Sequence, residues 1–147
     1  NKRPSDKQWK SAANELERIG MQGRGSTPFG LLSSGEQVMT LLARVLVSGP
    51  ELLILDEPTL SLDIVARADF RLMLDRLLSS RKNLSILLVT HHLEDIPAGT
   101  HGIALMTNGR ITASGPIGEM LTPLNLGKVF HRDVKVIHKN GGWQLIV

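Results

Sequence analysis

Cysteine and tyrosine are absent from this chain of 147 residues, and its aromatic residues amount to three Phe and two Trp. Without cysteine there can be no disulfide, cysteine-ligated zinc site or thiol nucleophile, which fits a reducing compartment. The few aromatic residues are scattered, so we expect no base-stacking platform for single-stranded nucleic acid. No apolar run approaches the length of about 18 residues that a membrane span needs. The remaining composition, 41% hydrophobic and 21% charged, is that of a globular domain.

Strong charge of one sign is also lacking. The formal net charge is +3, too mild to argue for nucleic acid, and we expect no such partner. Its distribution is uneven, because residues 51–65 contain four acidic side chains and no Lys or Arg, whereas residues 1–25 and 66–82 are basic. An acidic island in a basic chain suits a divalent cation such as Mg²⁺, and the alternative is a charged turn.

Three stretches have the periodicity of amphipathic helices, namely Ser5–Ile19, Ser33–Ser48 and Ile64–Ser80. Ser33-Ser34-Gly35-Glu36 has the Ser-x-x-Glu pattern of a capping box at the start of the second. Gly49-Pro50 follows this helix and predicts its end.

A short apolar run over residues 51–56 predicts a strand that is buried on both faces, and a run over residues 84–90 predicts a second apolar strand. With the helix between them they form a βαβ unit, so we expect them to be parallel. Asn108-Gly109 predicts a hairpin between Gly102–Thr107 and Arg110–Ser114. A second hairpin is predicted over Asp133–Val147, with its turn at residues 140–142.

The predicted parallel strands end in polar residues that carry chemistry. The first ends at Asp56-Glu57 and the second at Thr90-His91, and ligands of open parallel sheets bind beyond such ends. If the strands lie close together, two carboxylates and an imidazole converge on one edge. Four apolar residues followed by Asp-Glu form the Walker B arrangement, in which Asp56 would hold Mg²⁺ and Glu57 would activate the attacking water. The alternative is a strand that simply ends in a polar turn.

The order and spacing of several motifs resemble the ATP-binding cassette (ABC) ATPases. Leu32–Glu36 is similar to their signature motif and Leu53–Pro58 to Walker B. Ser61-Leu62-Asp63 resembles the D-loop, and His91 the switch histidine. The resemblance extends from about Phe29 to Gly118. It implies an α/β fold with part of a P-loop NTPase-type core with parallel strands, part of an α-helical subdomain and carboxyl-terminal β-hairpins.

The resemblance also implies a site that is shared between two cassettes in a head-to-tail dimer. The signature helix would face the ATP of the second cassette, so the implied nucleotide-binding residues are Ser33, Ser34, Gly35, Glu36 and Asp63. His91 would contact the γ-phosphate or the attacking water, which makes His91 and Glu57 the catalytic pair. The implied cofactors are ATP and Mg²⁺, with Asp56 as the metal ligand.

Three residues depart from the family pattern. Glu36 stands where Gln is usual, Ser34 replaces a Gly, and Leu60 replaces a small or polar residue of the D-loop. A metal site formed by His91, His92 and Asp95 is an alternative reading, although adjacent side chains diverge on a strand or helix. Three other histidines are expected at the surface: His101, His131 and His138.

The 147 residues contain no Walker A motif to wrap the phosphates. With no initiator Met either, the chain is expected to be the carboxyl-terminal half of a cassette, hydrolysing little ATP alone. Residues 1–48 would belong to the helical subdomain with the signature helix. Residues 49–115 would form the catalytic core with Walker B, the D-loop and the switch histidine, and residues 116–147 a helix and hairpin tail.

The predicted function is that of the ATP-binding and ATP-hydrolysing subunit of an ABC-type transporter or a related soluble cassette. Its partners would be a second cassette and membrane-embedded permease subunits, which places it in the cytoplasm, at the inner face of the membrane where a permease is bound. Three alternatives stay open: a translation-type cassette, a DNA-maintenance cassette and a non-catalytic fragment. The short first helix and the lack of cysteine argue against the DNA-maintenance type.

Overall fold

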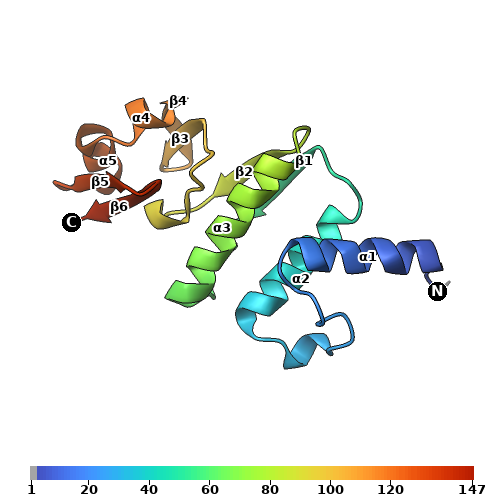
Figure 1. The fold of residues 1–147 in the computed structure, drawn as a ribbon. Helices are drawn as coiled ribbons and strands as arrows, with labels where there is room; N and C mark the ends of the chain where they lie inside the picture. The colour runs from blue at the N-terminus through green and yellow to red at the C-terminus, as the bar shows by residue number, and fades with distance from the viewer. Residues whose placement is uncertain (1–2) are drawn as a thin grey trace. The chain divides into compact units, whose positions relative to one another are not determined.

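The computed structural model describes residues 3–147, which form two compact units, up to Thr90 and from His91 onward. Figure 1 shows the helices and strands of each unit. The mixed α/β architecture with a parallel strand pair and two hairpins confirms the predicted fold class. The boundaries at residues 48 and 115 stay predictions. None of the described helices has both the length and the apolar character that a membrane span requires.

The first unit contains three long helices, each of which begins at a capping side chain. They are α1 (Asp6–Arg18), α2 (Ser34–Leu46) and α3 (Ile64–Ser80). The caps Ser5, Ser33 and Asp63 each accept a hydrogen bond from a backbone N–H group in the first turn of their helix. A short 3-10 turn, η1 (Phe29–Leu31), precedes α2. The three helices predicted from periodicity are therefore confirmed, to within two residues at their ends.

Two parallel strands, β1 (Leu52–Asp56) and β2 (Ser85–Val89), pair in a register that sets Asp56 opposite Val89. Helix α3 connects them, as expected for a βαβ unit. The core of the unit combines side chains of β1 with the apolar stripe of α3 and with α2. Its buried members include Leu42, Leu46, Leu53, Phe70, Met73, Leu74 and Leu77.

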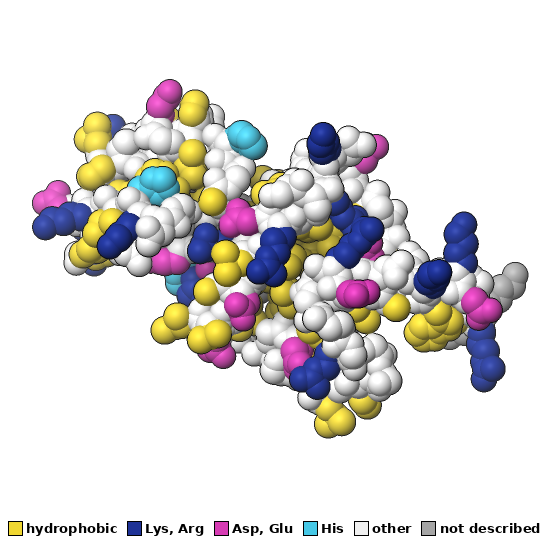
Figure 2. Space-filling model, viewed as in Figure 1, with side chains coloured by type: hydrophobic (Ala, Val, Ile, Leu, Met, Phe, Trp, Pro, Cys, Tyr) yellow, Lys and Arg dark blue, Asp and Glu magenta, His cyan; other side chains and the backbone are white. Residues whose placement is uncertain are grey.

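The prediction that the strand over residues 51–56 is buried on both faces is wrong. Leu52 and Ile54 of β1 are 55% and 61% exposed, and Leu87 of β2 is 53% exposed. Leu53, which points to the opposite face, is only 3% exposed. Successive side chains of a strand point to opposite faces, and among the described residues only one face of this two-stranded sheet is covered. Figure 2 shows apolar side chains at the surface among the charged ones.

The second unit is built from two antiparallel hairpins and two short helices. Strands β3 (Gly102–Thr107) and β4 (Arg110–Pro116) join at Asn108-Gly109, where both φ angles are positive. After α4 (Ile117–Met120) and α5 (Pro123–Phe130) comes the hairpin of β5 (Lys135–Lys139) and β6 (Gly142–Ile146). The 3-10 turn η2 (Leu93–Asp95) lies at the start of the unit. Both predicted hairpins are confirmed.

An ion pair between the buried Glu15 and the partly buried Arg81 ties the three helices of the first unit together. Glu15 of α1 is only 8% exposed, and its Oε2 accepts a hydrogen bond from Arg81, the residue after α3. Another guanidinium nitrogen of Arg81 donates to the carbonyl of Leu46, the last residue of α2, at 3.4 Å. A second cation, Arg18, bonds the other oxygen of Glu15 at 3.2 Å, but its side chain is 65% exposed. Arg81 thus holds the carboxyl end of α2 beside α1 and α3.

We expect Arg81→Met to lower the free energy of unfolding by about 2–3 kcal/mol, because it leaves the buried carboxylate of Glu15 with one exposed partner. The matched control is Arg18→Met, which removes the exposed cation from the same carboxylate and should cost less than about 1 kcal/mol. Urea denaturation of the two variants measures the difference. Equal losses would show that burial does not distinguish the two arginines.

Candidate functional site

The amino-terminal end of α2 is held by a reciprocal capping box. The Oγ of Ser33 accepts a hydrogen bond from the N–H of Glu36 at 3.3 Å, and Glu36 Oε2 accepts one from the N–H of Ser33 at 2.9 Å. Gln37 Nε2 donates to the carbonyls of Phe29 and Leu32, at 3.2 and 3.1 Å, which fixes the chain that leads into the helix. The predicted capping box is confirmed. Its geometry leaves first-turn N–H groups directed out of the helix end, where an anion is favoured.

The carboxylate of Glu36 has a second partner that the capping-box motif does not predict. Its Oε1 lies 2.8 Å from Nε of Arg24, in the loop between α1 and η1. The hydrogen bond from the Ser33 N–H lowers the pKa of Glu36 below its ordinary value, with smaller contributions from the Ser33 hydroxyl and the positive charge of Arg24. Glu36 is therefore a carboxylate at neutral pH.

The amino-terminal end of α3 lies against that of α2. A Cβ added at Gly35 would stand 3.2 Å from the Cβ of Ala66, closer than side chains normally pack. Ala66 in turn donates its N–H to Oδ1 of Asp63 at 2.8 Å, which caps α3. The structure thus brings the Ser33–Glu36 segment and Asp63 together at two neighbouring helix ends. Gly35 is the residue that permits this close approach.

The backbone turns sharply where β1 ends. Asp56 is exposed, whereas Glu57 is half-buried and has a φ of 45°, in the left-handed region that residues other than glycine seldom adopt. The Glu57 N–H donates to the carbonyl of Val89 at 2.9 Å, so it continues the strand pairing by one residue. Its Oε2 is buried. Strain of this kind, held by the surrounding structure, is frequent at functional sites.

His91 belongs to the second unit, two residues after β2 ends. Its ring lies 3.9 Å from that of His92, centroid to centroid, with the planes inclined by 39°. No group of three or more His, Asp or Glu side chains within residues 3–147 is arranged to hold a metal ion. The convergence of His91 with Asp56 and Glu57 stays a prediction. His101, His131 and His138 are exposed, as expected.

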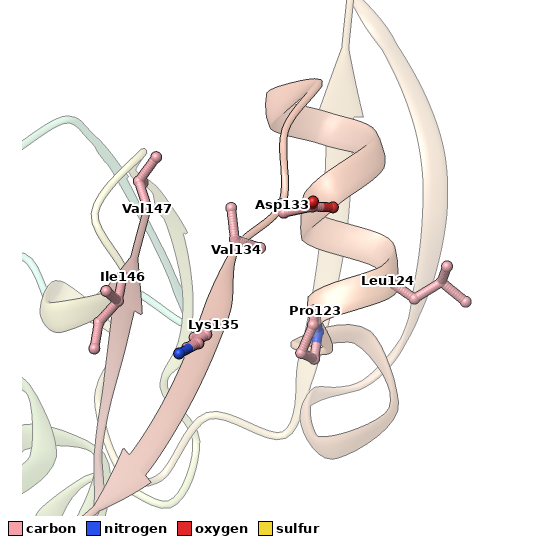
Figure 3. A pocket seen from close by; sticks show the side chains of 7 residues that line it. All are labelled: Pro123, Leu124, Asp133, Val134, Lys135, Ile146 and Val147. Atoms are coloured by element: carbon pink, nitrogen blue, oxygen red, sulfur yellow. The ribbon is translucent and has the colours of Figure 1, made fainter.

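The second unit has a surface pocket of about 640 Å³ between the start of α5 and the strands β5 and β6 (Figure 3). Its lining is apolar except for Asp133 and Lys135. None of the residues predicted from the sequence to bind nucleotide or to act in catalysis lines it. It is not a candidate for the chemistry described above.

Comparison with known proteins points to one family. A family model described as "ABC transporter" matches residues 1–60. An ABC transporter ATP-binding protein of Bacillus subtilis, YlmA, described as uncharacterized, is 36% identical over 91% of this chain and 51% of its own length. The molybdenum import ATP-binding protein ModC of Rhodobacter capsulatus is 32% identical over 86% of this chain and 35% of its own length. The chain therefore spans about half the length of the first of these relatives and about a third of the length of the second.

A solved structure points to the same family. The cassette cbiO1 of Clostridium perfringens, part of the ABC transporter complex cbiONQ, superposes on 86% of this chain with a TM-score of 0.72 and 28% identity, and half of that cassette is covered. The chain belongs to the ATP-binding cassette family. Its relatives are ATP-binding subunits of ABC transporters, and the resemblance inferred from the motifs is confirmed.

Two features of this ABC segment could not be predicted from the sequence. The positive φ of Glu57 follows from the tight turn that ends β1 and has no sequence signature. The Arg24–Glu36 contact joins residues twelve positions apart across a loop, so no periodicity predicts it. The one available signal is the carboxylate of Glu36 itself, because its negative charge attracts a nearby cation.

We expect Ser33→Ala to lower the free energy of unfolding by about 1 kcal/mol, because it removes the acceptor that caps α2. The matched control is Ser34→Ala, at the first helical position, where the exposed hydroxyl makes no cap; its effect should stay within about 0.5 kcal/mol. Thermal or urea unfolding measures both. A neutral Ser33→Ala would mean that the cap contributes nothing to the helix.

Proposed function

We propose that this segment supplies the water-activating and signature parts of an ATP-hydrolysing ABC cassette, and that a Walker A loop of the same protein supplies the main phosphate grip. The observation that carries the proposal is the conformation and burial of Glu57. It follows the apolar strand β1 directly, adopts a strained backbone conformation, and has one buried carboxylate oxygen. A carboxylate held in this way is suited to act as a base next to a bound nucleotide.

Asp56 would hold Mg²⁺. It is exposed at the carboxyl end of β1, and Mg²⁺ in phosphate sites needs only one or two protein carboxylates, the remaining ligands being phosphate oxygens and waters. The bound ion would neutralise charge on the phosphates. The residues present therefore fit this cofactor.

Hydrolysis needs a base for the attacking water. The water oxygen attacks the γ-phosphorus, the bond from that phosphorus to the bridging oxygen breaks, and ADP leaves. In this proposal Glu57 accepts the proton that the water loses, while His91 contacts the γ-phosphate or that water. The role of His91 rests on the family pattern.

The signature segment would serve the nucleotide of a second cassette. The first-turn N–H groups of α2 and the Ser33 hydroxyl suit a phosphate, and Asp63 lies at the adjacent end of α3. This arrangement supports a head-to-tail dimer in which each cassette completes the site of the other. The N–H groups of Ser34 and Gly35 complete the phosphate-facing segment, and Glu36 contributes to it through the capping box with Ser33 and not by contact with the phosphate.

The named relatives support a role in import. A molybdenum import protein is among the chains similar to this one. In this proposal the cassette works with membrane-embedded permease subunits, at the inner face of the membrane. A translation-type or DNA-maintenance cassette has no comparable support among these relatives.

In the complete protein that contains this segment, we expect Glu57→Gln to lower the rate of ATP hydrolysis about 10²- to 10⁴-fold, because the amide cannot accept the proton of the water. ATP binding should remain. The matched control is Glu51→Gln, which makes the same change at an exposed residue just before β1 and should hydrolyse ATP normally. Steady-state phosphate release and nucleotide binding are the measurements. Normal turnover by Glu57→Gln would refute the proposed base.

A further inference from the structure

The carboxylate of Glu36 creates an electrostatic problem for the proposed phosphate site. It lies in the first turn of α2, where a negative charge stabilises the helix but repels an approaching triphosphate. A neutral glutamine, the usual residue of the family at this position, would not repel it. A cation beside Glu36 would reduce this repulsion.

Arg24 is placed to do so. The Arg24 Nε lies 2.8 Å from Glu36 Oε1, while the other carboxylate oxygen of Glu36 accepts the N–H of Ser33. The loop that carries Arg24 is shaped by its own backbone bonds, from the Arg24 N–H to the carbonyl of Met21 at 3.2 Å and from the Thr27 N–H to the carbonyl of Arg24 at 2.9 Å. Arg24 is thus presented to the helix end by an ordered turn.

Stability does not explain this ion pair. The side chain of Arg24 is 54% exposed and that of Glu36 is 26% exposed, and exposed pairs of this kind contribute little to folding. Its electrostatic effect is local instead. Both oxygens of Glu36 have partners in the Arg24–Glu36–Ser33 arrangement, which leaves the N–H groups of Ser34 and Gly35 as the first-turn donors that face a ligand.

We propose that Arg24 is a positioning residue that neutralises and holds Glu36, so that the helix end can accept the phosphate of a nucleotide despite the substitution of Glu for Gln. This inference rests on the proposed function, because it requires ATP at the amino-terminal end of α2. Arg24 acts through Glu36 and does not itself touch the phosphate.

The experiment measures kcat/KM for MgATP in the complete protein at low ionic strength. Arg24→Gln leaves the carboxylate uncompensated and should lower kcat/KM about 3- to 10-fold, mainly through KM. Arg24→Lys keeps the charge and should stay within about twofold of wild type. The matched control is Lys10→Gln, which removes the same charge from the exposed face of α1 and should have no effect.

The deciding variant is the double substitution Arg24→Gln with Glu36→Gln. It removes both charges and should restore kcat/KM to within about twofold of wild type, a rescue that a merely structural role of Arg24 would not give. The deficit of Arg24→Gln should also shrink at about 1 M salt, where the Debye length falls to about 3 Å.

Two outcomes would overturn the inference: an Arg24→Gln variant with wild-type kcat/KM, or a double variant as impaired as Arg24→Gln alone. The second would mean that Arg24 acts independently of Glu36, through a structural role or by contacting the nucleotide directly. Glu57→Gln, measured in parallel, separates this failure from failure of the proposed function. If Glu57→Gln loses turnover while Arg24→Gln has normal kcat/KM, only the proposed role of Arg24 is refuted. If Glu57→Gln has normal turnover, both the proposed function and the role of Arg24 are refuted.

Discussion

The close contact between Gly35 and Ala66 is the constraint on which the proposed site depends. A side chain at Gly35 would press its Cβ against Ala66 and push the first turn of α2 away from α3, and the close approach sets Ser33 and Asp63 at neighbouring helix ends. At the other end of the same helices, Arg81 bonds both Glu15 and the last carbonyl of α2. Helix α2 is therefore fixed at both ends, so the N–H groups of its first turn have a defined direction.

Much of the fold could be predicted because the signals are local. The Ser-x-x-Glu capping box, the apolar stripe of α3 and the Asn-Gly turn of the β3–β4 hairpin each act within a few residues, and the structure has all three. Parallel pairing of β1 and β2 also followed, because a helix of suitable length connects two short apolar runs. These features depend on chain geometry more than on distant neighbours.

What could not be predicted depends on contacts between distant residues. The apolar run over residues 51–56 predicts a strand buried on both faces, but Leu52 and Ile54 are exposed, as is Leu87 of β2, because among the described residues only one face of the sheet has a covering layer. The strain at Glu57 and the pairing of Arg24 with Glu36 likewise require a folded chain. The motifs of the candidate site could be predicted from the sequence, whereas the pairing of the Glu36 carboxylate with a cation could not.

The central claim is that this ABC segment carries the group that activates water but lacks the loop that grips the phosphates. The most direct measurement is steady-state hydrolysis of MgATP by the purified 147-residue chain, with and without a separately added polypeptide that supplies the Walker A half of the cassette. We expect no steady turnover by the chain alone, and turnover when the two halves are combined. Steady hydrolysis by the chain alone would contradict the claim.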